Sequence, residues 1–172
     1  HPIWDHDMSS APLLIDTTVD GTPRKLVAVP SKQGWLYTFD RITGKPIWPM
    51  DEKPVPQTTM KGERTAPTQP FPSKPPAYSR THVAESELID FTPELRKQAL
   101  ENLEHFRWEQ TPYVPPTGPE SPDKLGSINI ANWNGGVNWP GSGFDPETGI
   151  FYTQAGNAAV TEFLTYLRDL VA

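Results

Sequence analysis

Proline is the residue that most limits what this chain can fold into. The 172 residues include 21 prolines, well above the ordinary frequency of about 5 %. They are dense between residues 49 and 122, where four lie close together: Pro70, Pro72, Pro75 and Pro76. Proline fixes φ and removes a backbone donor, so this stretch favours extended, loop-like backbone. Most of the regular structure is therefore expected in the flanking residues.

The residues before this stretch predict three short strands. An apolar run at 13–15 is followed by the turn pair Asp20-Gly21. Residues 26–29 are apolar and predict a strand buried on both faces, and residues 35–39 are rich in aromatic, β-prone side chains. Because the intervening segments are short, we expect an antiparallel meander.

One helix is predicted inside the proline-rich stretch. Thr92 is suited to the N-cap and Pro93 to the first helical position. The residues that follow place an apolar stripe on one helical face: Leu95, Ala99, Leu103 and Phe106.

Strands are expected again at 126–130 and 150–153. Beyond residue 158, apolar side chains recur at helical spacing and predict a short amphipathic helix. The chain thus divides into a β segment over 1–48, a proline-rich insert over 49–122, a second β segment over 123–157 and a helix over 158–172.

Composition excludes some classes of function. A net charge of −6 argues against nucleic acid or an anionic membrane as a partner. The absence of cysteine excludes disulfides, a thiol nucleophile and a cysteine-ligated zinc site. Six tryptophans argue against a disordered proline-rich adaptor, because disordered chains are poor in aromatic residues.

A short sequence occurs twice. Phe-Asp-Arg-Ile-Thr-Gly at 39–44 matches Phe-Asp-Pro-Glu-Thr-Gly at 144–149, and an aromatic residue follows each copy, Trp48 or Tyr152. One interpretation is a turn type used twice. The other is a repeated corner of a β-propeller blade, in which Asp caps the turn, Gly adopts positive φ and the aromatic ring, such as that of Trp48, packs between sheets.

The first copy, extended to Phe-Asp-x-x-Thr-Gly-Lys-x-x-Trp at 39–48, resembles the tryptophan-docking motif of the quinoprotein dehydrogenases. Trp-Asp-His-Asp at 4–7 followed by Lys-Gln-Gly at 32–34 is similar to the glucose-dehydrogenase branch of that family. The similarity continues through EKPVPQ, PTQPF, DFTPEL and GGVNWPGSGFDPETG. It therefore covers nearly the whole chain with several motifs in order.

The resemblance implies an all-β fold that is part of an eight-bladed β-propeller. This chain would contribute about two blades, the β segments above, together with a long proline-rich insert containing one helix. The other blades would belong to a longer protein, so we expect the 172 residues alone to lack dehydrogenase activity. The resemblance also implies a periplasmic or extracytoplasmic location.

The resemblance further implies pyrroloquinoline quinone (PQQ) as the cofactor and calcium or magnesium as the metal, with a lanthanide as an alternative. Asp5 would be the general base, and Lys32 would donate to the quinone oxygen. Asn138 and Trp139 would lie near the cofactor, and Asp5 and Asp7 would bind the metal.

Some roles stay open. Trp133 and Trp139 suit either cofactor neighbours or packed core residues. His1 and His6 form a metal pair by composition, although substrate-facing roles suit imidazoles better at a site for a hard cation.

The function implied is oxidation of an alcohol or sugar by hydride transfer to PQQ, with a quinone or cytochrome as electron acceptor. The alternative is a non-catalytic, propeller-derived binding or scaffold module. A pure scaffold has no need of Asp5, Lys32 and Asn138 together, so their presence favours the enzyme.

Overall fold

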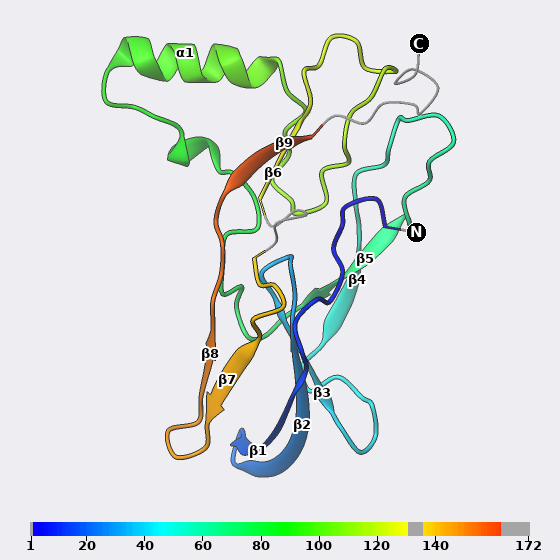
Figure 1. Cartoon of the computed structure of the whole chain (residues 1–172), viewed down its shortest axis with the longest axis vertical. Coiled ribbons are helices and arrows are strands. Elements are labelled where there is room, and N and C mark those ends of the chain that lie inside the picture. Colours follow the sequence, from blue (N-terminus) through cyan, green and yellow to red (C-terminus); the bar gives the residue numbers. More distant parts are fainter. Residues whose placement is uncertain (1, 131–135, 163–172) are drawn as a thin grey trace.

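The chain is built mainly from antiparallel strands (Figure 1). The computed structural model describes residues 2–130 and 136–162. Three strands, β1 (Leu13–Val19), β2 (Thr22–Pro30) and β3 (Leu36–Asp40), form one antiparallel sheet in the order β1-β2-β3. The predicted meander is confirmed. The β1–β2 hairpin turns through Asp20 and Gly21, both at positive φ, as the turn pair indicated.

The burial of β2 differs from the prediction. Leu26 and Ala28 are buried, but Val27 and Val29 between them are only half-buried. The strand is therefore not buried on both faces. In an antiparallel sheet one face commonly stays open, and alternate side chains then differ in burial.

The insert contains the predicted helix, α1 (Pro93–Glu104), and the Thr92 side chain accepts a hydrogen bond from the Leu95 N–H. We expected little regular structure in the insert besides this helix, and that expectation was wrong. Strands β4 (Met50–Pro54) and β5 (Thr68–Pro72) pair antiparallel, and a short 3₁₀ helix, η1, spans Glu85–Glu87. A two-stranded sheet leaves each strand one unpaired side, where proline costs no ladder hydrogen bond.

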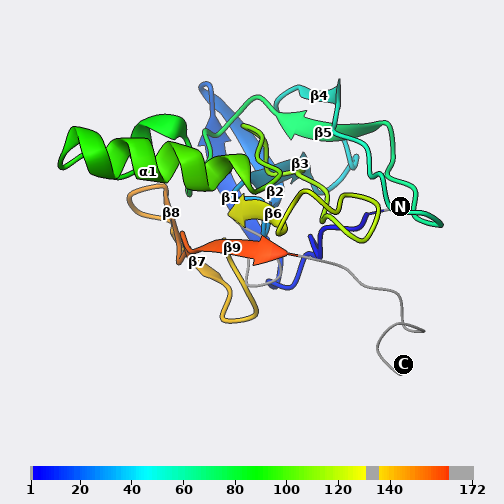
Figure 2. The same cartoon turned by 90° about the horizontal axis from the view of Figure 1, so that it is seen from above.

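Helix α1 lies at the periphery, where Figures 1 and 2 show it projecting beside the sheets. None of its residues is buried; in its apolar stripe, Ala99 and Leu103 are half-buried and Leu95 is exposed. In the part of the chain that the structure describes, no helix has the length and hydrophobicity to cross a bilayer.

The second β segment contains two strand pairs. Strand β7 (Ser142–Asp145) pairs with β8 (Ile150–Thr153), and β6 (Ser127–Ile130) pairs with β9 (Ala159–Glu162). Strand β9 occupies part of the predicted C-terminal helix, so that prediction was wrong for its residues. Pairing with β6, whose Ser127, Asn129 and Ile130 are buried, outweighs the helical spacing of the apolar residues. Residues 163–172 lie outside the described part.

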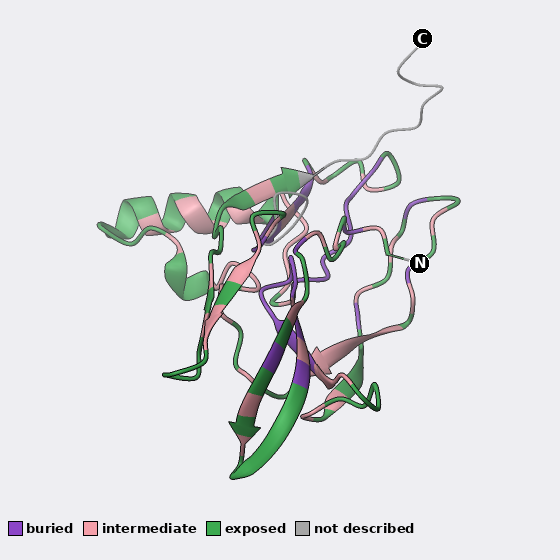
Figure 3. Cartoon of the chain, turned by 60° about the horizontal axis from the view of Figure 1, so that its bottom comes forward, coloured by how far each residue is buried: buried purple, intermediate pink, exposed green. Residues whose placement is uncertain are grey.

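Two apolar cores hold these elements together. The first contains Trp4, Trp35, Tyr37, Val55 and Tyr113. The second contains Ile15, Leu26, Ala28 and Leu36, and Phe144 and Phe151 of the β7–β8 hairpin pack against it. Figure 3 shows the buried residues gathered in the middle of the molecule. Trp48, expected between two sheets, is only half-buried in this chain.

The repeated sequence adopts the same turn twice. Oδ1 of Asp40 accepts hydrogen bonds from the N–H groups of Ile42, at 3.0 Å, and Thr43, at 2.8 Å. In the second copy, Asp145 Oδ1 accepts from the Glu147 N–H at 2.9 Å. The closing glycines have φ of 72° and 71°. Asp as the turn cap and Gly at positive φ are therefore confirmed in both copies.

Removal of the Asp40 cap should weaken the fold in a pH-dependent way. Hydrogen bonds from the backbone and hydroxyl of Thr43 lower the pKa of Asp40, so its stabilisation is present above the pKa of the unfolded chain, about 4. The stabilisation is lost as the pH falls through the lower folded pKa. We expect Asp40→Ala to lower Tm at neutral pH and to approach the wild-type Tm in acid. Thermal melts across pH, with the exposed Asp90→Ala as control, test this; a pH-independent difference would contradict it.

Candidate active site

A buried lysine meets two carboxylates where β2 ends. Lys32 is only 5 % exposed. Its Nζ lies 3.1 Å from Asp5 Oδ2 and also forms an ion pair with Asp7 Oδ1. Both aspartate side chains are more than half exposed, so the pairs join a buried cation to an accessible surface. The structure thus brings together Asp5, Asp7 and Lys32, which the sequence analysis selected.

The charge of Lys32 is maintained by its partners. Burial alone lowers the pKa of a lysine, but the hydrogen bonds and charges of Asp7 and Asp5 outweigh it and raise the pKa of Lys32. Lys32 is therefore an ammonium at neutral pH. It can donate a hydrogen bond to an acceptor that develops negative charge.

A tight backbone turn positions this lysine. The Ser31 N–H donates to the Trp35 carbonyl and the Gly34 N–H to the Ser31 carbonyl, both at 3.0 Å. Gly34 adopts φ +87°, a conformation that glycine takes readily. The Gly136 N–H donates to the Lys32 carbonyl at 2.8 Å, so the second β segment also holds this turn.

The N-terminal segment presents different side chains on its two sides. Asp5 and Asp7 pair with Lys32, whereas the alternate residues Trp4, His6 and Met8 line a cavity. One short segment therefore supplies both the ion pairs and a wall of the cavity.

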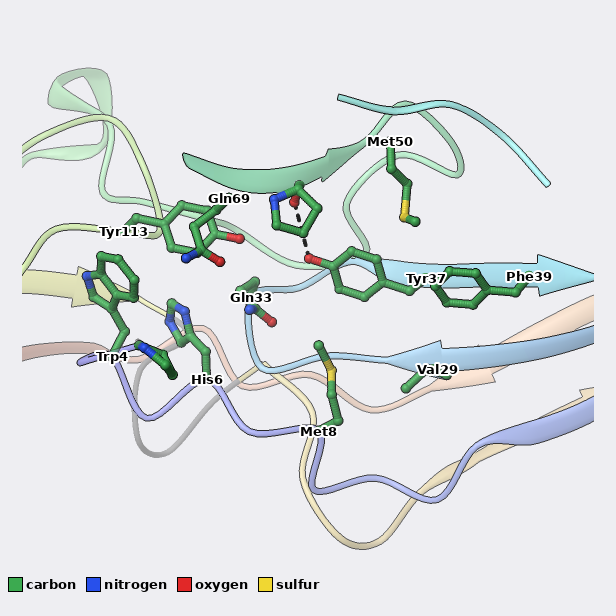
Figure 4. Close-up of a pocket in the computed structure, with 12 residues that line it drawn as sticks. Trp4, His6, Met8, Val29, Gln33, Tyr37, Phe39, Met50, Gln69 and Tyr113 are labelled. Carbon is green, nitrogen blue, oxygen red and sulfur yellow. Dashed lines mark hydrogen bonds between the residues drawn. The ribbon is translucent and has the colours of Figure 1, made fainter. Parts of the chain in front are cut away.

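The cavity has a volume of about 470 Å³ and is mainly apolar (Figure 4). Its aromatic wall contains Trp4 and Tyr113, whose rings meet edge to face at 5.2 Å between centroids, and His6 stacks on Trp4 at 6.0 Å. Buried Gln33, next to Lys32 in sequence, also lines it, and its Oε1 accepts no hydrogen bond from the described residues. The other lining residues are Pro2, Met8, Val29, Tyr37, Phe39, Met50, Gln69 and Pro70.

The tyrosines of this cavity stay protonated. Burial raises the pKa of Tyr37 to about 12. Burial and the neighbouring Tyr37 also raise the pKa of Tyr113. Tyr37 and Tyr113 therefore contribute neutral surface to the cavity.

Among the described residues, the other predicted cofactor residues form no hydrogen bond or ion pair with Asp5, Asp7 or Lys32. Asn138 is half-buried, and its Oδ1 accepts from the Trp139 N–H at 3.0 Å. Trp139 is 79 % exposed, and neither residue lines the cavity. Trp133 and His1 lie outside the described residues.

The sequence analysis did not predict that the proline-rich insert contributes residues to the cavity and to the turn that carries Lys32. Tyr113, 1 % exposed, completes the aromatic wall, and Tyr78 contacts the turn that carries Lys32. No local motif marks either residue. Their positions follow from the path of irregular chain across the sheets, which periodicity does not encode.

The donor types fit part of a hard-cation site. Asp5 and Asp7 offer carboxylate oxygens, the ligands that calcium and magnesium prefer. Among the described residues, no group of three or more acidic, histidine or cysteine side chains is placed to hold a metal. These two aspartates therefore account for only a subset of the ligands of such a site. The Lys32 ammonium suits a quinone oxygen.

The family is established by sequence. A family model described as "PQQ: Glucose/ethanol/alcohol dehydrogenase, beta-propeller domain" matches residues 1–168. The chain therefore belongs to the PQQ-dependent glucose/ethanol/alcohol dehydrogenase family and is part of its β-propeller domain, as expected from the repeated corners and from the Trp-Asp-His-Asp segment.

Two relatives with similar sequences agree with this assignment. The chain is 31 % identical over 151 residues to the glycerol dehydrogenase large subunit of Gluconobacter thailandicus, covering 86 % of this chain and 20 % of the relative. It is 42 % identical over 71 residues to the quinoprotein glucose dehydrogenase of Escherichia coli, covering 41 % of this chain and 9 % of that protein. The quinohemoprotein alcohol dehydrogenase of Comamonas testosteroni aligns with a TM-score of 0.45 at 20 % identity, over 91 % of this chain and 16 % of that structure. The chain spans at most about a fifth of these relatives.

Proposed function

We propose that this chain supplies catalytic residues to a PQQ-dependent dehydrogenase that oxidises an alcohol or a sugar, with Asp5 as general base. The observation that carries the proposal is the pairing of buried Lys32 with accessible Asp5 and Asp7. Membership in the dehydrogenase family supports it.

Each residue would have a distinct role. Asp5, as a carboxylate, would accept the proton of the substrate hydroxyl. PQQ, when bound, supplies the electrophilic carbonyl that takes up hydride from the substrate carbon. Lys32 would donate a hydrogen bond to the quinone oxygen and stabilise its developing negative charge. Asp7 would hold a divalent cation with Asp5, and Asn138 and Trp139 would approach the cofactor from the second β segment.

The electron acceptor, the compartment and the metal are part of the same proposal. By analogy with the family, the electrons would pass to a quinone or a cytochrome in a periplasmic or extracytoplasmic compartment. The metal would be calcium or magnesium, with a lanthanide as the alternative. The remaining cofactor and substrate contacts would come from blades beyond these 172 residues.

Lys32→Ala in the holoenzyme should lower kcat about 10²-fold, because it removes a charge-assisted donor, and should weaken PQQ binding. Dye-reduction kinetics and a PQQ titration measure the two effects. The control is Lys97→Ala, which removes an exposed lysine paired with Glu101 on α1. Wild-type kcat and affinity in Lys32→Ala would refute the role of Lys32.

A further inference from the structure

Tyr78 binds the turn that carries Lys32. Its hydroxyl accepts a hydrogen bond from the Ser31 N–H at 3.0 Å and donates one to the Ser31 carbonyl. Ser31 is completely buried and directly precedes Lys32. One tyrosine, 47 residues away in sequence, therefore engages both backbone polar groups of the residue before the lysine.

The same segment also holds the far side of the turn. The Tyr78 N–H donates to the Gly34 carbonyl at 2.9 Å. Ser79 packs so closely that a Cβ on Gly34 would lie 2.3 Å from the Ser79 Oγ. Tyr78 and Ser79 thus contact residues on both sides of Lys32: Ser31 before it and Gly34 after it.

The phenol is suited to a permanent role. Burial raises the pKa of Tyr78 well above its ordinary value, so the hydroxyl keeps the proton that it donates to Ser31. The ring packs against the core cluster of Ile15, Leu26, Ala28 and Leu36. Because the ring packs against residues of the β1–β3 sheet, the position of the hydroxyl is fixed relative to that sheet.

We propose that Tyr78 is a positioning residue that fixes the backbone at Ser31 and so holds the Lys32 ammonium at the reacting centre. Lysine has a long, flexible side chain, and the place of its ammonium depends on where its backbone is anchored. Tyr78 acts through Lys32, and the inference rests on the proposed function because it takes the role of Lys32 from it.

The test is a double-mutant cycle in the holoenzyme. Tyr78→Phe keeps the ring and removes the hydroxyl, and it should lower kcat and PQQ affinity about tenfold each through loss of a hydrogen bond and of alignment. In a Lys32→Ala background the same change should have little further effect, because the group being positioned is gone. Tyr152→Phe, at a ring that is 55 % exposed, is the matched control and should behave as wild type.

Gly136→Ala provides an independent perturbation of the same turn. Its added Cβ would lie 3.1 Å from the Lys32 carbonyl and 3.0 Å from the Ser79 Oγ. It should also lower kcat and PQQ affinity, with the loss again absent beside Lys32→Ala. This variant carries the test if Tyr78→Phe does not fold.

The outcomes separate the two proposals. Wild-type behaviour of Tyr78→Phe, or an equal loss in both backgrounds, would overturn the positioning role and leave the proposed function intact. Wild-type kinetics in Lys32→Ala would overturn the role of Lys32 and the positioning role with it. Coupling of the two substitutions in both kcat and PQQ affinity would support the inference.

Discussion

Asp5→Asn should lower kcat of the holoenzyme by about 10²- to 10⁴-fold, the range for loss of a general base. The amide has the shape of the carboxylate but cannot accept the substrate proton. Asp5 has a φ of +36°, and asparagine tolerates positive φ well, so the backbone should be retained. PQQ affinity should change little, because Lys32, the proposed hydrogen-bond donor to the quinone, remains. Stopped-flow or dye-reduction kinetics, with a PQQ titration, measure both effects.

Asp20→Asn is the matched control for this change. Asp20 also has positive φ, at 49°, but it is exposed at the tip of the β1–β2 hairpin. It should retain wild-type kcat. If Asp5→Asn also retained near-normal kcat, Asp5 would not be the general base, and the ion pair with Lys32 would be structural.

Gly34→Ala should destabilise the protein by about 2–3 kcal/mol, a large effect for one added methyl group. Gly34 has a φ of +87°, where an L side chain costs about 1–2 kcal/mol. The new Cβ would also lie 2.3 Å from the Ser79 Oγ, so one of the two must move. Because this turn carries Lys32, kcat should fall as well. Urea unfolding and steady-state kinetics measure these losses.

Two companion variants separate the causes. Gly44 has a similar φ of 72°, but a Cβ there meets nothing within 4 Å, so Gly44→Ala should show the backbone cost alone. Adding Ser79→Ala to Gly34→Ala should recover part of the stability by removing the close oxygen. Equal losses in Gly34→Ala and Gly44→Ala would show that the contact with Ser79 can relax without cost.

Local sequence was sufficient to predict the structural features that depend on residues close together in the chain. The Asp-x-x-Thr-Gly turns form at 40–44 and 145–149 because the Asp carboxylate reaches donors two or three residues away. Helix α1 begins at Pro93 because the Thr92 side chain accepts a hydrogen bond from a backbone N–H only three residues away. The meander of β1 to β3 follows from short apolar runs joined by tight turns.

The candidate site was identified in part. Asp5, Asp7 and Lys32 were selected by resemblance, and the structure brings them together. Asn138 and Trp139 were selected on the same basis, but among the described residues neither forms a hydrogen bond with this cluster or lines the cavity. Their assignment remains a prediction.

Tertiary structure decided the features that depend on partners far away in the sequence. Residues 159–162 begin a segment whose apolar side chains recur at helical spacing, yet they form β9 because they pair with the backbone of β6. β4 and β5 pair despite their prolines, because each has a free side. Tyr78 contacts Ser31 although 47 residues separate the two in sequence. Periodicity and turn chemistry describe neighbours within a few residues, whereas these three outcomes depend on which surfaces the folded chain brings side by side.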